Sequence, residues 1–108
     1  MKKSILLVGI FFTMMAVAQG NTGVTEVPIE VTRGLTKAYQ NMDSSQRTTQ
    51  IKMHEKAYVD MMNYVNNSEI PTEEKEGILR NVNSMYPNNY VMQKAEAIDR
   101  VDHVKSLM

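Results

Sequence analysis

The sequence has no cysteine and no tryptophan, and its formal net charge is zero, with 12 basic and 12 acidic residues. Without cysteine the chain can form no disulfide framework and no site that depends on a thiolate. A balanced charge argues against a general nucleic-acid-binding protein, because such proteins carry a basic excess. A length of 108 residues allows one small domain and excludes a multidomain enzyme.

The N-terminus has the layout of a secretory signal peptide. A basic start, MKK, precedes an apolar run over residues 5–18 that ends in a small-x-small pattern. A permanent anchor needs about 20 apolar residues, so we expect cleavage, export to the periplasm or the medium, and no stable membrane insertion afterwards. An uncleaved anchor or a buried helix is the alternative. The expected signal peptide is residues 1–18, and its cleavage site is formed by Ala16, Ala18 and Gln19.

Large apolar residues are scarce once the expected signal is removed. The remaining 90 residues contain no phenylalanine and only three leucines, so the apolar filling is mainly Val, Ile, Met and Tyr. A small domain buries a low fraction of its surface, and a core of this composition is expected to be marginal. Residues 19–27 are polar and contain two glycines, which predicts a flexible lead before a domain over residues 28–108.

Apolar residues recur at helical spacing in four stretches, and no stretch alternates as a strand would. Pro28 suits a first helical position, and Asp43 is typical of an N-cap. Thr72 precedes acidic residues of a first turn and is a candidate N-cap as well. The fold class is therefore predicted to be all-α, a small bundle of four short helices. The predicted helices cover residues 28–42, 44–66, 72–86 and 89–107.

The second predicted helix is apolar over about half of its circumference, which predicts contact with two neighbours. The last predicted helix carries an apolar stripe whose spacing resembles a helix–helix seam. This stripe either closes the bundle internally or is shared with a second copy or another protein. It is the candidate interaction face, and it consists of Tyr90, Ala97, Val101, Val104 and Met108.

Candidate catalytic and metal-binding groups are few. His54 lies on the apolar side of the second predicted helix, and no carboxylate stands three or four residues away to orient it as a base. Glu96, Asp99 and His103 share one helix face, which is either an open metal site lacking a fourth ligand or a solvated face with an ordinary ion pair. We expect no enzyme activity, no cofactor and no metal site here.

Methionine is unusually frequent, and seven of the ten methionines lie after residue 18. Thioethers together with His54 suggest a Cu(I) or Ag(I) site, but no two methionines are three or four residues apart. Core filling or an adaptable surface is the favoured interpretation. A metal-binding protein of the cell envelope, based on Met and His, remains the alternative.

The segment MDSSQR, residues 42–47, resembles the Leu-Thr-x-x-Gln helix starts of small periplasmic stress chaperones, although the Leu and Thr are both replaced. The resemblance covers six residues and adds a chaperone-like role to the candidate functions. No glycine-rich phosphate loop and no basic cluster occurs, so no nucleic-acid partner is expected. The sequence predicts a non-catalytic module that binds a protein or peptide.

Overall fold

A computed structural model describes residues 26–108. The expected signal peptide, the cleavage residues Ala16, Ala18 and Gln19, and most of the expected lead lie outside this range. Over the described range the chain forms four helices and no strand, which confirms the predicted all-α bundle. No helix in residues 26–108 has both the length and the hydropathy needed to cross a bilayer. The helices are α1 (Ile29–Ala38), α2 (Ser44–Asn67), α3 (Thr72–Met85) and α4 (Tyr90–Ser106).

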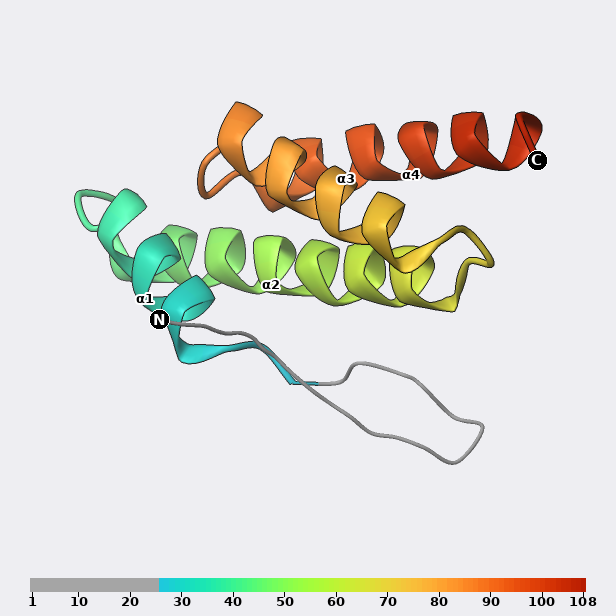
Figure 1. Ribbon diagram of the computed structural model, residues 1–108. Helices are drawn as coiled ribbons and strands as arrows, with labels where there is room; N and C mark the ends of the chain where they lie inside the picture. Colours follow the sequence, from blue (N-terminus) through green and yellow to red (C-terminus); the bar gives the residue numbers. More distant parts are fainter. Residues whose placement is uncertain (1–25) are drawn as a thin grey trace.

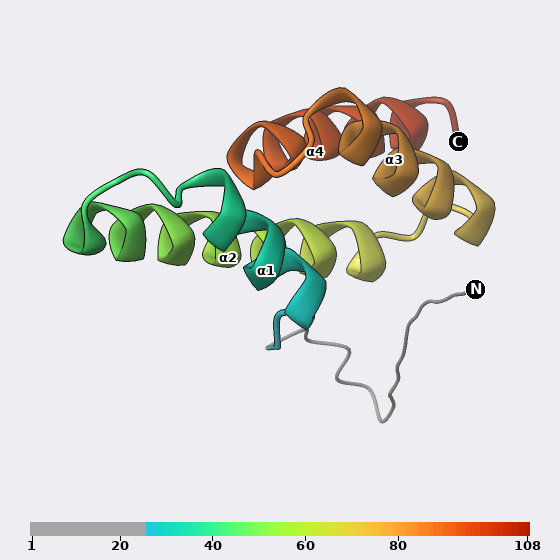
Figure 2. The ribbon, with the colours of Figure 1, turned by 90° about the vertical axis from the view of Figure 1, so that its left-hand side faces the viewer.

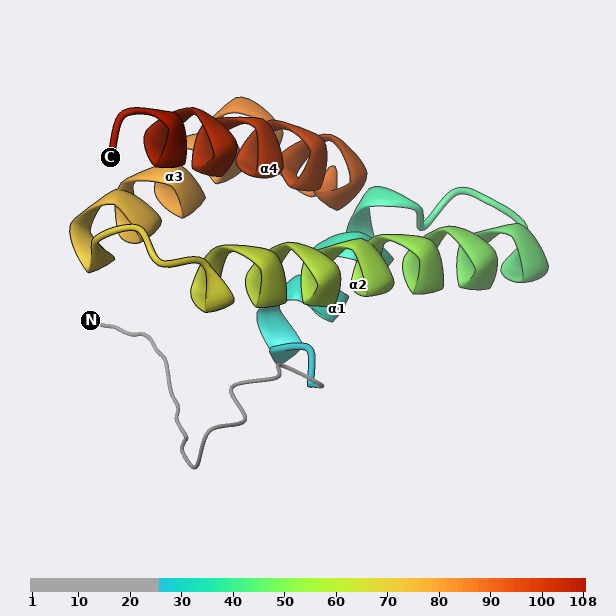
Figure 3. The ribbon, with the colours of Figure 1, turned by 90° about the vertical axis from the view of Figure 1, so that its right-hand side faces the viewer.

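Helices α2 and α4 run side by side in the same direction and share the largest interface (Figures 1 and 3). Helix α3 runs in the opposite direction, connects the end of α2 to the start of α4, and packs on α4. Helix α1 packs on α2 (Figure 2). The hydrogen bonds between α2 and α4 follow the same order along both helices, from His54–Tyr90 through Asp60–Lys94. The prediction that the second helix touches two neighbours is confirmed, because α2 packs against both α1 and α4.

The core lies where the four helices converge, and it is built mainly from small and branched aliphatic side chains. Full burial of a Val or Leu side chain stabilises the fold by about 1.5–3 kcal/mol, a large share of the stability of a domain this small. The buried apolar residues are Val31, Leu35, Ala57, Met61, Val65, Ile70, Ile78, Val82, Tyr90, Ala97 and Val101.

Side chains cap the N-termini of two helices, Asp43 that of α2 and Asn89 that of α4. The Asp43 carboxylate accepts the Ser45 N–H at 3.0 Å at the start of α2, as its sequence position predicts. The prediction that Thr72 is the cap of α3 is wrong, because the cap position is taken by Pro71 and no side chain bonds to the amides of the first turn.

Helix α1 ends four residues earlier than its apolar pattern predicts. The amide of Tyr39 still bonds to the Leu35 carbonyl at 3.0 Å, but the Met42 amide then bonds only three residues back, to Tyr39, at 3.1 Å. This tight turn leads the chain into α2 and brings the Tyr39 hydroxyl to His54. Met42 therefore lies outside the helix and is exposed, contrary to the predicted continuous apolar face.

Candidate functional site

His54 is buried in the centre of the bundle, with 4% of its surface exposed. Its Nδ1 accepts the backbone N–H of Tyr90 at 3.1 Å, and its Nε2 lies 2.9 Å from the Tyr39 hydroxyl. Because a backbone N–H can only donate, Nδ1 must be unprotonated. The hydrogen bonds therefore assign a neutral ring that carries its proton on Nε2 and donates it to the Tyr39 oxygen.

Tyrosine rings surround this imidazole. The centroid of the His54 ring lies 5.6 Å from that of Tyr39 and 6.5 Å from that of Tyr90, and Tyr58 stands edge-on against Tyr90 at 5.5 Å. Burial lowers the pKa of His54, because an apolar environment disfavours the imidazolium ion. Burial likewise raises the pKa of Tyr90, and it raises the pKa of Tyr58 to about 12 with smaller contributions from Tyr90 and Glu30. Burial thus favours the uncharged forms of the His54, Tyr58 and Tyr90 rings in this histidine–tyrosine cluster.

The position of His54 indicates a structural role, as a cap at the N-terminus of α4. Tyr90 is the first residue of α4, and its N–H is one of the four N-terminal amides that have no partner inside their own helix. His54 supplies the missing acceptor from α2, while the Asn89 side chain accepts the Met92 amide at 3.2 Å. A ring that is buried, with both nitrogens hydrogen-bonded, is not placed to take a proton from a substrate.

The acidic face predicted on the last helix is divided by an ion pair. Glu96 Oε2 accepts from Arg100 Nε at 2.8 Å, whereas Asp99 and His103 are exposed. Within the described part of the chain, no three His, Cys, Asp or Glu side chains come together as metal ligands. A thioether–imidazole site at Met61 and His54 would have to break at least one of the two hydrogen bonds of the buried ring.

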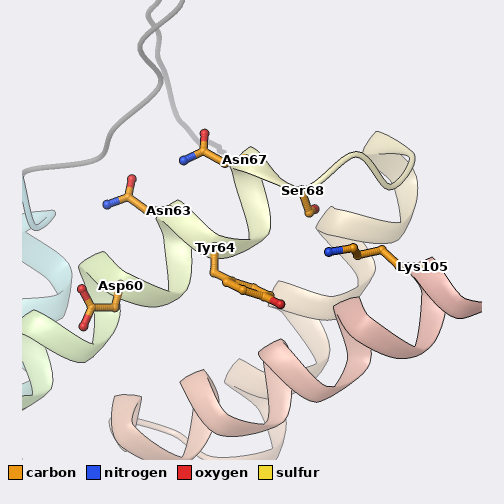
Figure 4. Close-up of a pocket in the computed structure, with 6 residues that line it drawn as sticks. All are labelled: Asp60, Asn63, Tyr64, Asn67, Ser68 and Lys105. Carbon is orange, nitrogen blue, oxygen red and sulfur yellow. The ribbon is translucent and has the colours of Figure 1, made fainter.

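A shallow hollow of about 450 Å³ lies over the second half of α2, beside the end of α4 (Figure 4). Asp60, Asn63, Tyr64 and Asn67 line it from one face of α2, with the spacing i, i+3, i+4 and i+7. In the sequence this polar stripe looks like an ordinary solvated helix face, so the hollow was not predicted. The remaining lining residues are Ser68 and Lys105.

The carboxylate at the hollow already has partners in the chain. Asp60 accepts from Lys56 at 3.0 Å and from Lys94 at 3.2 Å, and the bond from Lys56 is the main reason that its pKa is lowered. The Tyr64 hydroxyl donates to Asp102 at 2.5 Å, which raises the pKa of Tyr64. The hollow is thus lined by hydroxyl and amide groups, a paired carboxylate and the Lys105 ammonium group, and none of its described residues is arranged as an activated base or nucleophile.

The candidate interaction face on α4 is turned mostly inward. Tyr90, Ala97 and Val101 belong to the core, and Val104 is half-buried and packs against it. Only Met108, which follows the helix, projects fully into solvent. Within this chain the face therefore closes the bundle against α2 and α3.

Methionine occupies the surface far more than the core. Met61 is buried, but five of the seven methionines after residue 18 are at least 36% exposed. Four of these belong to segments that meet at one end of the bundle (Figure 1): Met42 just before α2, Met53 in the first half of α2, Met85 at the end of α3 and Met92 in the first turn of α4. Valine and isoleucine fill the interior instead. The four residues, which we call the methionine end, are Met42, Met53, Met85 and Met92.

Comparison of the chain with protein-family models, curated proteins and solved structures finds no significant match. Any function must therefore be argued from the residues of this chain.

Proposed function

We propose that this chain is a small exported helical protein that binds another protein or a peptide and catalyses no reaction. The methionine end is the observation that carries the proposal. Thioether side chains are flexible and polarizable, and proteins that bind varied partners use them on adaptable surfaces. Val91, in the first turn of α4, adds a further apolar side chain that is 40% exposed.

The basic start, the apolar run over residues 5–18 and the small residues before Gln19 support export. The absence of cysteine makes folding independent of the redox state of the compartment. The chemistry of the described residues supports binding over catalysis, because the buried histidine acts as a helix cap and the Asp60 carboxylate of the hollow is paired with two lysines.

Binding through the methionine end is tested with a four-site variant. Met42, Met53, Met85 and Met92 are changed to Gln, which keeps a similar length and flexibility but removes the apolar contact. The matched control is Met108→Gln, a methionine that is also exposed but lies outside the methionine end. Circular dichroism of each protein checks that the helices are retained.

Each protein, tagged and starting at Gln19, is used to capture partners from the envelope fraction of the native host. A partner captured by the parent is then purified, and its dissociation constant is measured with all three proteins. We expect binding at least about tenfold weaker for the four-site variant, equivalent to about 1.4 kcal/mol, and unchanged for Met108→Gln. No captured partner, or equal affinity for all three, would contradict the proposal.

A further inference from the structure

We propose that His54 is an acid-operated latch, which holds the start of α4 on α2 while its ring is neutral and releases it when the ring binds a proton. The latch concerns the stability of the bundle and does not depend on the proposed binding function.

The hydrogen bonds of the ring are compatible with one charge state only. A proton on Nδ1 would face the N–H of Tyr90 across the present 3.1 Å separation, so that two donors oppose each other. On the other side, Nε2 already carries a proton and donates it to Tyr39, so a second proton can bind only at Nδ1. Protonation therefore removes the acceptor that holds the first turn of α4 and leaves a buried charge in its place.

The surroundings of His54 offer that charge no counter-ion. Tyr39 faces the ring from the end of α1, Tyr90 from α4, and Tyr58 stands one turn along α2, so the aromatic neighbours of the ring include no carboxylate. Glu55, the neighbour in sequence, accepts the Thr32 hydroxyl at 2.5 Å. The turn that precedes α4 has the uncharged sequence YPNN. No ion pair within residues 26–108 includes His54.

Burial lowers the pKa of His54 in the folded chain, in keeping with this geometry. The unfolded or locally opened chain then binds a proton at a higher pH than the closed form does. The contribution to stability is complete above the ordinary value of 6.5 and declines as the pH falls below it toward the lowered value. Acid thus favours the opened form.

Opening at this point has a defined structural consequence. The His54–Tyr90 bond ties the first turn of α4 to α2, whereas the protonated ring can still donate from Nε2 to Tyr39. Loss of the bond to Tyr90 frees the start of α4, where the Tyr90 side chain has only 7% of its surface exposed in the closed bundle and packs edge-on against Tyr58. Mild acid would therefore uncover core side chains at the start of α4 before the whole chain unfolds.

Amide hydrogen exchange of Tyr90 tests the latch in the unmodified chain. Exchange is measured at about pH 7.5 and about pH 5 and corrected for the intrinsic rate. We expect the opened fraction at Tyr90 to rise by about tenfold or more at the lower pH. The upper bound is about thirtyfold, because the exposed ring titrates near 6.5. Equal corrected protection at both pH values would overturn the proposal.

Two variants assign the response to the ring. His54→Asn places an uncharged oxygen where Nδ1 accepts, so it should abolish the pH dependence. His103→Gln removes the other histidine, which is exposed, and should leave the pH dependence of exchange at Tyr90 unchanged. A response that persists in His54→Asn, or disappears in His103→Gln, would overturn the latch. If His54→Asn fails to fold, the nitrogen chemical shifts of the native ring decide, because a charged His54 in the closed state at about pH 5 contradicts the mechanism.

Discussion

The side chain of Asn88 lies directly over Gly34, so close that a methyl group on Gly34 would stand 2.6 Å from Asn88 Oδ1. Gly34 is in the middle of α1, whereas Asn88 is in the turn between α3 and α4 and has a φ of 61°. Asparagine tolerates this left-handed conformation better than most residues. The missing side chain at Gly34 thus allows the first helix to approach the last turn of the fold.

Gly34→Ala should stabilise the fold by less than about 1 kcal/mol, the amount by which alanine favours a helix over glycine. The added methyl group displaces the end of the Asn88 side chain, and this displacement offsets part or all of the gain. Gly77→Ala is the matched control, because nothing lies within 4 Å of a methyl group there. That variant should be more stable by about 0.5–1 kcal/mol.

Urea denaturation of both alanine variants measures the difference. Asn88→Gly should restore the gain in Gly34→Ala, since glycine accepts the positive φ and removes the clashing amide. An equal gain in stability from the two alanine substitutions would show that Asn88 does not press on α1.

Val101→Asp should unfold the chain. Val101 has no exposed surface and lies in the core among α2, α3 and α4, so the substitution buries an unpaired carboxylate at a cost of several kcal/mol. Val91→Asp is the control, because Val91 is 40% exposed in the first turn of α4, where an acidic side chain is favourable. Circular dichroism and sedimentation compare the two variants. If the parent chain associates and Val101→Asp gives a helical monomer, this face of α4 forms an interface between chains and not the core of one chain.

Alkaline pH should destabilise the fold through Tyr58. Its pKa rises from 10.0 to about 12 on folding, so the unfolded chain releases the phenolic proton first as the pH increases. The stabilisation is complete below pH 10.0 and is lost as the pH approaches 12, by up to about 3 kcal/mol. Tyr58→Phe keeps the ring and should remove much of this loss. The free energies of unfolding of the parent and of Tyr58→Phe are compared at alkaline pH. The same pH dependence in both proteins would contradict the role assigned to Tyr58.

Export predicts a shortened chain. Protein recovered from the envelope or medium of the native host should have an intact mass that corresponds to a start at Gln19. Ala18→Arg places a large charged residue at the cleavage site and should cause the uncleaved form to accumulate, whereas Asn21→Arg, just beyond the site, should be processed. A soluble cytoplasmic protein that retains Met1 would refute the signal peptide.

The helices could be predicted because their signals are local. Apolar spacing placed all four, and Asp43 marks the start of α2 through a bond to an amide two residues away. The end of α1 was misplaced because Tyr39 leaves the helix where its hydroxyl meets His54, 15 residues further along the chain. The hollow on α2 was missed because nothing in a polar stripe distinguishes a lining from an ordinary solvated face.

The sequence by itself determined that the described chain is helical, where its helices lie and that one of them touches two others, because periodicity and turn residues act over a few positions. Only the tertiary structure decided that α2 and α4 run in parallel, that His54 caps α4 and that most methionines face solvent. These outcomes depend on which helix faces meet. Residues such as His54 and Tyr90, 36 positions apart, acquire their relation only when packing brings them together.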